Sequence, residues 1–229
     1  MAIYEAGSIA AFLAALAWVL KSRDPIHLGA LIGGFMIFGF DWLWCSRGFF
    51  NATFTQDLFM IPGIHILGER YPLAVACNWA VGYGLMPLLV SRYHAPIGRV
   101  LGRLHFPVMF AVFGVVDLLI EGLLISGIGV YRYHQAPQFL VLGAAWSNFW
   151  LLGGLPDANT RYWLLGGLLT FAYFGLAYVR RWAAIPAGAG FGPCRETTWK
   201  GVCLAAGTVW ASAFFLTVVQ YFWYSATTP

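Results

Sequence analysis

The feature that most constrains this chain is a series of apolar stretches, several of them long enough to form a helix that crosses a membrane. Such a helix needs about 20 consecutive, mostly apolar residues. The connections between the stretches combine glycine or proline with charged residues, a pattern that is typical of helix ends. We predict seven spans, at residues 3–20, 27–45, 71–89, 106–130, 138–153, 162–178 and 201–224. Because the fifth and sixth are short, six helices are an alternative to seven.

The composition agrees with this interpretation. Of the 229 residues, 60% are hydrophobic and only 10% are charged, and the mean hydropathy is +0.72. A soluble domain carries about 25% charged residues, because these cover its surface in water. We therefore predict an all-α fold, a single polytopic transmembrane bundle of about seven helices over residues 1–229. The same argument predicts a multi-pass integral membrane protein.

The net charge of +4 comes from thirteen basic and nine acidic residues, and the basic residues form no stripe. We therefore expect no nucleic-acid partner, and the small excess fits loops beside the anionic headgroups of membrane lipid. The seven-span scheme puts six basic residues on one side of the membrane, namely Lys21, Arg23, Arg92, Arg99, Arg103 and Arg161. It puts seven on the other side: Arg47, Arg70, Arg132, Arg180, Arg181, Arg195 and Lys200. The positive-inside rule then does not decide the orientation.

The longest connection, residues 46–70, contains FFNATFTQDLFMIPGIHILGER. This segment is too apolar for a free aqueous loop. Irregular backbone at membrane depth is tolerated only where protein or a water-filled cavity surrounds it. We expect a re-entrant or interfacial segment that caps one end of the bundle.

Three acidic residues lie at membrane depth in the predicted spans. Asp117 and Glu121 are near the middle of the fourth, and Asp41 is toward the end of the second. Ionisable side chains at this depth are costly and mark functional sites, although hydrogen bonding between helices is an alternative role. The spacing of four residues puts Asp117 and Glu121 on one helix face. Two carboxyl groups this close in low dielectric do not both ionise, so one is expected to hold a proton and to serve as a general acid.

Aromatic residues make up 18% of the chain. The faces of aromatic rings stabilise a cation when water is excluded, so acids lined by such rings suit protonation of an alkene or carbonyl. A belt of Trp and Tyr at the membrane interface is the alternative explanation. We expect the pocket lining to include Trp42, Trp79, Tyr83 and Trp146, together with Asn78, whose alternative role is interhelical hydrogen bonding.

The five histidines lie near span ends, at His27, His65, His94, His105 and His134, without HxxxH or HxxH spacing. No span carries a central histidine for a haem or a central lysine for a retinal Schiff base. We therefore expect no metal and no cofactor. A quinone- or metal-linked oxidoreductase would need the histidines at the span ends to converge.

Two runs resemble a known family. FFNATF after the second span, and VVDLLIEGLLISGIGVYRY in the fourth, are similar to segments of the AveC-like spirocyclase family. That family has an FNPTF-like segment and a D-x-x-x-E helix that runs into a G-x-Y-x-Y-like end. The matching positions are Asn51, Phe54, Asp117, Glu121, Gly129, Tyr131 and Tyr133. The resemblance covers roughly residues 41–133, and WSNFWLLGG occupies the place of the family's later FP-x-YE-like segment.

The resemblance implies an intramembrane cyclase with Asp117 and Glu121 in its site and with Asn51, Phe54 and Tyr131 as substrate contacts. The heptahelical layout is also similar to that of small integral-membrane terpene cyclases, although the last span has no acid and Gln220 is its nearest polar group. The functional hypothesis is a cofactor-independent cyclase of a lipophilic isoprenoid or polyketide-derived substrate. The alternative is a small transporter, receptor or subunit of a membrane complex. Oligomeric state and the identity of the proton donor stay open.

Overall fold

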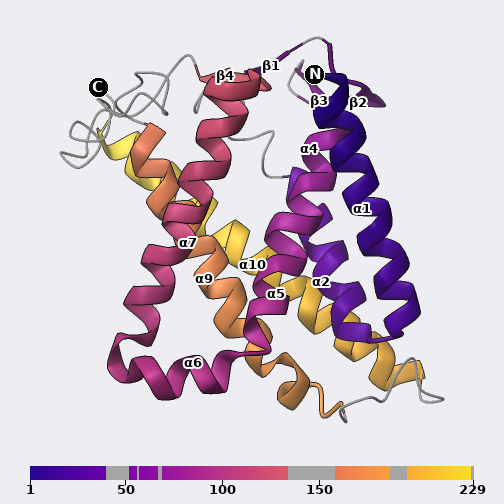
Figure 1. Cartoon of the computed structure of the whole chain (residues 1–229), viewed down its shortest axis with the longest axis vertical. Helices are drawn as coiled ribbons and strands as arrows, with labels where there is room; N and C mark the ends of the chain where they lie inside the picture. Colours follow the sequence, from indigo (N-terminus) through magenta and orange to yellow (C-terminus); the bar gives the residue numbers. More distant parts are fainter. Residues whose placement is uncertain (40–51, 56, 67–68, 134–157, 186–194, 228–229) are drawn as a thin grey trace.

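A computed structural model gives the fold of the chain (Figure 1). It describes residues 1–39, 52–55, 57–66, 69–133, 158–185 and 195–227. Most of these residues are helical. The helical segments are α1 (Ala2–Ser22), α2 (Pro25–Phe35), α4 (Leu73–Asn78), η1 (Trp79–Leu85), α5 (Met86–Ser91), α6 (His94–Leu101), η2 (Gly102–Leu104), α7 (His105–Gly122), η3 (Leu123–Ile128), α9 (Ala158–Trp182) and α10 (Arg195–Thr227).

Among the residues that the structure describes, three helical segments are long and apolar enough to cross a membrane: Ala2–Ser22, Leu73–Ser91 and His94–Val116. The third includes α6, which lies across the base of α7 (Figure 1). Six of the predicted spans coincide with described helices. Within the described residues, α2 ends at Phe35, whereas its predicted span continues to residue 45. The fifth predicted span lies outside the described residues, so the count of seven helices is not confirmed.

The connection predicted before the fourth span is helical instead of a loop, because α6 occupies His94–Leu101. Pro96 falls in its first turn, where a missing N–H costs no intrahelical hydrogen bond. The third predicted span also begins slightly later than expected. Tyr71 belongs to a strand, and helix α4 starts at Leu73, with Pro72 as its N-cap.

Two short antiparallel strand pairs qualify the all-α prediction. β1 (Ala52–Phe54) pairs with β4 (Tyr131–Tyr133), and β2 (Met60–Ile66) pairs with β3 (Glu69–Pro72). Phe54 is directly opposite Tyr131 in the first pair. The strands lie at one end of the helical bundle, where α1 begins, and β1 to β3 come from the 46–70 segment (Figure 1). We refer to this end as the strand end and to the opposite end as the α6 end.

Helix α9 runs in the opposite direction from the one that the seven-span scheme requires. It begins at the strand end, where β4 also lies, and it finishes at the α6 end (Figure 1). There Arg180 forms an ion pair with Asp24 in the turn between α1 and α2. The seven-span scheme places these two residues on opposite sides of the membrane, so that assignment of sides is wrong.

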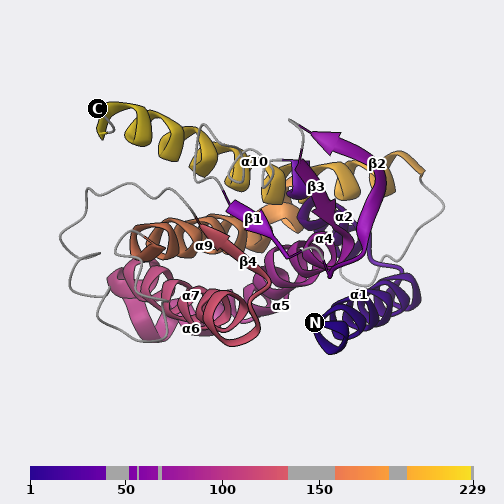
Figure 2. The ribbon, with the colours of Figure 1, turned by 90° about the horizontal axis from the view of Figure 1, so that it is seen from above.

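Helix α2 is largely buried between η1 and α10, and glycines allow its close packing. A Cβ at Gly34 would lie 2.8 Å from the Cα of Gly84 in η1, and a Cβ at Gly33 would lie 2.6 Å from the carbonyl oxygen of Ala206 in α10. Small residues at helix crossings let backbones approach one another in a membrane bundle. Seen from above, α10 lies along one side of the bundle, whereas α1 and α7 lie on the other (Figure 2).

Candidate functional site

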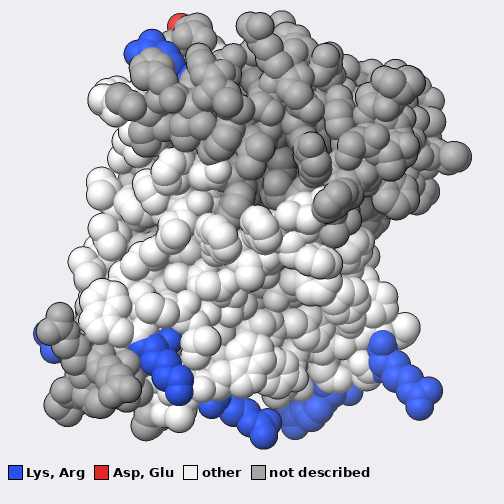
Figure 3. Space-filling model, turned by 180° about the vertical axis from the view of Figure 1, so that it is seen from behind, with Lys and Arg blue, Asp and Glu red and all other residues white. Residues whose placement is uncertain are grey.

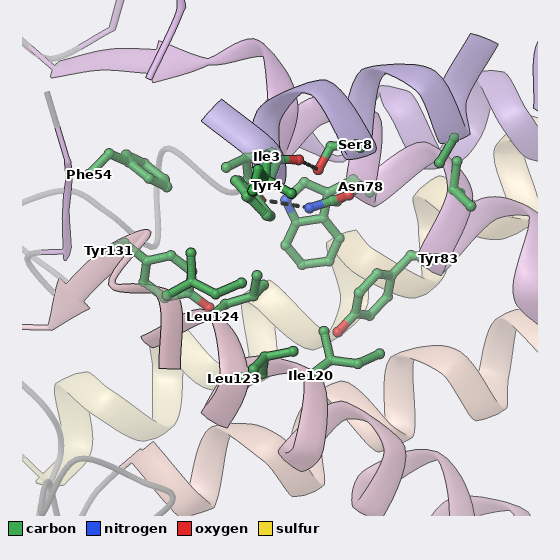
Figure 4. A pocket seen from close by; sticks show the side chains of 17 residues that line it. Ile3, Tyr4, Ser8, Phe54, Asn78, Tyr83, Ile120, Leu123, Leu124 and Tyr131 are labelled. Carbon is green, nitrogen blue, oxygen red and sulfur yellow. Dashed lines mark hydrogen bonds between the residues drawn. The ribbon is translucent and has the colours of Figure 1, made fainter. Parts of the chain in front are cut away.

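A cavity of about 450 Å³ lies in the half of the bundle next to the strand end. Its walls come from α1, from α4 and η1, from α7 and η3, and from the paired strands β1 and β4 (Figure 4). The lining residues are Ile3, Tyr4, Gly7, Ser8, Ala11, Phe54, Val75, Asn78, Trp79, Val81, Gly82, Tyr83, Ile120, Leu123, Leu124, Ile128 and Tyr131. None of these described lining residues carries a charge, so the cavity suits an apolar occupant.

The cavity brings together five residues that the sequence analysis singled out for separate reasons: Phe54, Asn78, Trp79, Tyr83 and Tyr131. Phe54 and Tyr131 come from the family resemblance, and the other three come from the search for polar and aromatic groups at membrane depth. Four other predicted site residues lie outside the described residues, namely Asp41, Trp42, Asn51 and Trp146.

Asp117 and Glu121 belong to α7, which confirms that they share one continuous helix. The structure does not describe their side chains. It does describe the neighbouring positions on the helix. Ile120, Leu123 and Leu124 form the α7–η3 wall of the cavity (Figure 4). The turn that carries the two acids therefore adjoins the cavity.

Hydrogen bonds hold the polar residues of the cavity wall. The amide nitrogen of Asn78 donates to the hydroxyl oxygen of Tyr4 at 2.7 Å, which links α4 to α1 (Figure 4). The indole N–H of Trp79 donates to the hydroxyl oxygen of Tyr71 at 3.1 Å. The hydroxyl of Ser8 donates to the carbonyl oxygen of Tyr4 at 2.8 Å. In an apolar environment such bonds fix the side chains, because no water competes for the donors.

Aromatic rings cover two sides of the cavity. Trp79 and Tyr83 have ring centroids 4.3 Å apart, and Phe54 lies 5.8 Å from Tyr131 and 5.5 Å from Tyr71. Trp79 and Tyr131 are buried, and the Tyr83 hydroxyl points toward Ile120 of α7 (Figure 4). These ring faces provide the negative electrostatic potential that stabilises a cation in a site without water.

Two wide helical turns flank the cavity. Both η1 and η3 are π-helical, and together they supply seven of its lining residues. π-helical turns in α-helices occur frequently at functional sites, because they displace side chains from the regular helical spacing. Gly129 ends the second of these segments with φ of 74°, a left-handed conformation that favours glycine. It lets the chain turn from η3 into β4, where Tyr131 reaches the cavity.

Sequence reasoning missed two residues of the cavity region. Tyr4 in α1 accepts the hydrogen bond from Asn78, and Tyr71 in β3 accepts the one from Trp79. The sequence did offer one signal for the Tyr4–Asn78 contact, because Tyr4 lies at the start of the first predicted span and Asn78 lies in the first half of the third. The two residues can meet only when these two helices run in the same direction, so that both spans start at the strand end.

The three histidines whose side chains the structure describes do not line this cavity. His94 and His105 have ring centroids 4.8 Å apart at the α6 end, where the Nε2 of His105 lies 2.7 Å from the Tyr173 hydroxyl. His27 is also at the α6 end, with its Nδ1 2.8 Å from the Ser22 hydroxyl and its Nε2 2.8 Å from Arg92. Within the part of the chain that the structure describes, no group of three or more His, Cys, Asp or Glu side chains could hold a metal ion.

No protein-family model, curated protein or solved structure matches this chain.

Proposed function

We propose that the protein is a multi-pass membrane enzyme that cyclises a lipophilic isoprenoid or polyketide-derived molecule in the cavity between α1 and α7. Asp117 and Glu121 would supply the acid, and no cofactor would take part. The observation that carries the proposal is the convergence of Phe54, Asn78, Trp79, Tyr83 and Tyr131 on one apolar cavity. The wall of that cavity also includes residues from the acid-bearing turn of α7.

The register of α7 supports the role of the acids. Positions 117, 120, 121 and 124 are spaced by three or four residues, which is the spacing of one helix face. Ile120 and Leu124 line the cavity. We infer that Asp117 and Glu121 act at the same wall, where a low dielectric favours one shared proton over two charges.

The proposed chemistry begins with transfer of that proton to an alkene, an epoxide or a carbonyl of the substrate. The resulting cation is attacked by a second double bond or by a hydroxyl group of the same molecule, which closes a ring. Loss of a proton to the carboxylate restores the acid and gives a product with the mass of the precursor. A ketone that forms a spiroketal with two hydroxyl groups loses one water. Tyr83, Trp79 and Tyr131 would stabilise the cation through their ring faces.

The position of the cavity between α1 and α7 supports a substrate that arrives from the lipid. Ile3 is 91% exposed, Leu123 is 57% exposed and Ile120 is 45% exposed, although all three line the cavity. Apolar side chains that face both a cavity and the outer surface form a lateral opening between the helices. A lipophilic molecule would pass through it from the hydrocarbon core without crossing water. Ion transport, the alternative function, calls for polar or charged groups along a path instead.

The resemblance to the AveC-like spirocyclase family gains support from the strand pairing. β1 follows Asn51 and ends at Phe54, and β4 carries Tyr131 and Tyr133, so the two resembling segments lie side by side. We propose on this basis that the chain shares the intramembrane acid site of that family. Whether the product is a spiroketal or a terpenoid ring is left to the experiment.

The experiment is mass spectrometry of lipid extracts from cells that make the wild type or the Asp117→Asn/Glu121→Gln variant. The cells are fed a panel of linear prenylated and polyketide precursors. We expect a wild-type peak, isobaric with a precursor or lighter by one water, that the double variant does not form.

The matched control is Asp57→Asn, an exposed acid at the strand end that does not line the cavity. It should form as much product as the wild type, and equal amounts of all three proteins in the membrane fraction must be verified first. Identical extracts from wild type and double variant across the whole panel would refute the cyclase and favour transport or binding.

A further inference from the structure

The basic residues gather at the α6 end. The structure describes the side chains of nine lysines and arginines, and eight of them lie at this end: Lys21, Arg23, Arg92, Arg99, Arg103, Arg180, Arg181 and Lys200. Figure 3 shows blue lysine and arginine side chains along the lower edge of the molecule. Arg70 is the ninth and lies at the strand end, in β3.

The positions of the other basic residues preserve this asymmetry. Arg195 starts α10 at the α6 end, whereas Arg132 in β4 and Arg161 near the start of α9 lie at the strand end. Of the twelve basic positions that the structure describes, nine then lie at the α6 end and three at the strand end, where the seven-span scheme divides the same twelve into six and six; Arg47 lies outside the described residues. The reversal of α9 produces this difference, because it moves Arg180, Arg181, Arg195 and Lys200 to the α6 end and Arg161 to the strand end.

Most of the charges at the α6 end face outward. Among the described side chains of this group, only Arg180 forms an ion pair with a carboxylate, that of Asp24. Arg92 is held by His27 and lies over the ring of Trp18. Arg99 and Arg103 are exposed on α6 and η2, which lie across the base of α7 and not along the bundle (Figure 1).

We infer that the α6 end lies at the cytoplasmic surface of the membrane, with Arg99 and Arg103 on the anionic headgroups of that leaflet. Basic residues beside span ends are retained on the cytoplasmic side, and the anionic headgroups of that leaflet attract those that lie near its surface. The inference rests on the membrane location proposed above but not on the reaction. It places the cavity in the half of the membrane away from the cytoplasm, so the substrate reaches it from that leaflet.

The orientation is tested with reporters fused after Pro229 in a bacterial host, because α10 ends at the strand end. Alkaline phosphatase, which is active only outside the cytoplasm, should be active in this fusion. A fluorescent protein that matures only inside the cytoplasm should stay dark. The reverse pattern in protein that resists an alkaline carbonate wash would overturn the orientation alone. Release of the protein by that wash would contradict its location in the membrane.

The headgroup contact is tested with the full chain in lipid nanodiscs of phosphatidylcholine alone or with added phosphatidylglycerol. The anionic lipid should raise the midpoint of thermal unfolding at low salt, and high salt should abolish the increase. Arg99→Gln/Arg103→Gln should lose most of the increase, whereas the matched variant Arg70→Gln should keep it. Midpoints in phosphatidylcholine alone establish that both variants fold. An equal increase in all three proteins would overturn the assignment of the contact to α6 and η2.

Discussion

The two halves of the bundle use polar side chains in different ways. At the α6 end, polar groups pair with one another: Asp24 accepts hydrogen bonds from Arg180 and from the N–H of Ile26, and His27 lies between Ser22 and Arg92. In the half next to the strand end, the pair of Asn78 and Tyr4 stands at the wall of an apolar cavity. Polar groups therefore pair with one another at the α6 end, whereas at the strand end they form part of the wall of an apolar cavity.

Substitution of the two acids of α7 should have the largest effect on product formation. It also distinguishes most clearly between the cavity half of the bundle and the α6 end. Asp117→Asn and Glu121→Gln, made singly, should both reduce product formation. Substitution of the residue that donates the proton should lower product formation by about 10²–10⁴-fold, the range typical of general acid catalysis. Substitution of its partner should lower product formation less. Product is quantified by mass spectrometry at equal membrane expression. Full activity in both single variants would exclude an acid function for this turn of α7.

Two glycines of η1 give a matched pair of substitutions. A side chain at Gly84 would meet the backbone of Ala30 in α2, whereas a Cβ at Gly82 has no described atom within 4 Å, and Gly82 lines the cavity. Gly84→Leu should lower the stability by about 1–3 kcal/mol or more through overpacking. Gly82→Leu should fold as the wild type does and lose at least about tenfold in activity, since filling the pocket excludes the ligand.

Thermal unfolding in detergent, measured beside product formation, distinguishes these two substitutions. A Gly82→Leu protein that is folded and fully active would show that the cavity is not the site. A Gly84→Leu protein of unchanged stability would contradict the close crossing of α2 and η1.

The ion pair of the α6 end should affect stability and not chemistry. Asp24→Asn removes the charge that Arg180 faces, and a hydrogen bond to a charged group contributes about 1.5–3 kcal/mol. The lower end of that range applies, because the Arg180 side chain is 35% exposed and water screens it. The unfolding midpoint should fall while the set of products stays the same. A set of products that differs from that of the wild type would show that the α6 end also affects the chemistry.

Tyr4→Phe gives the smallest expected effect. It removes the hydroxyl that accepts from Asn78 and leaves the ring in place. Hydrogen bonds between membrane helices contribute about 0.6 kcal/mol on average, so a small decrease in the unfolding midpoint is expected. If Asn78 orients the ligand, the ratio of products should change more than the stability does. Tyr93→Phe, at an exposed tyrosine that does not line the cavity, serves as the matched control.

Much of the helical layout could be predicted from sequence. Long apolar runs are recognisable whatever their partners, so α1, the Leu73–Ser91 segment and α7 fall close to the predicted spans. α9 and α10 extend beyond theirs, because helical hydrogen bonding continues into polar turns that a search for apolar runs excludes. The all-α prediction missed both strand pairs, and β1 and β4 are strands of three residues, which leave almost no pattern.

The candidate site was predictable only as a set of residues. Phe54, Asn78, Trp79, Tyr83 and Tyr131 could be selected by type and by resemblance, but their convergence depends on the direction of α1 and on the pairing of β1 with β4. The seven-span scheme gave α9 the wrong direction. In such a scheme, the side assigned to each connection depends on the number of spans that precede it. A single long-range contact, that of Arg180 with Asp24, corrects the direction.

The glycines of α2 also bear on how the chain assembles. Gly29 and Gly33 pack against Val202 and Ala206 of α10, which the ribosome translates long after α2. While the ribosome is still translating the middle of the chain, α10 does not yet cover this face of α2, and lipid or an assembly factor must shield it. Domains form in order during synthesis where their contacts are local, but here the contact joins two helices that are far apart in the sequence. Premature termination before α10 should therefore leave an inserted but unfinished bundle, a natural target for membrane quality control.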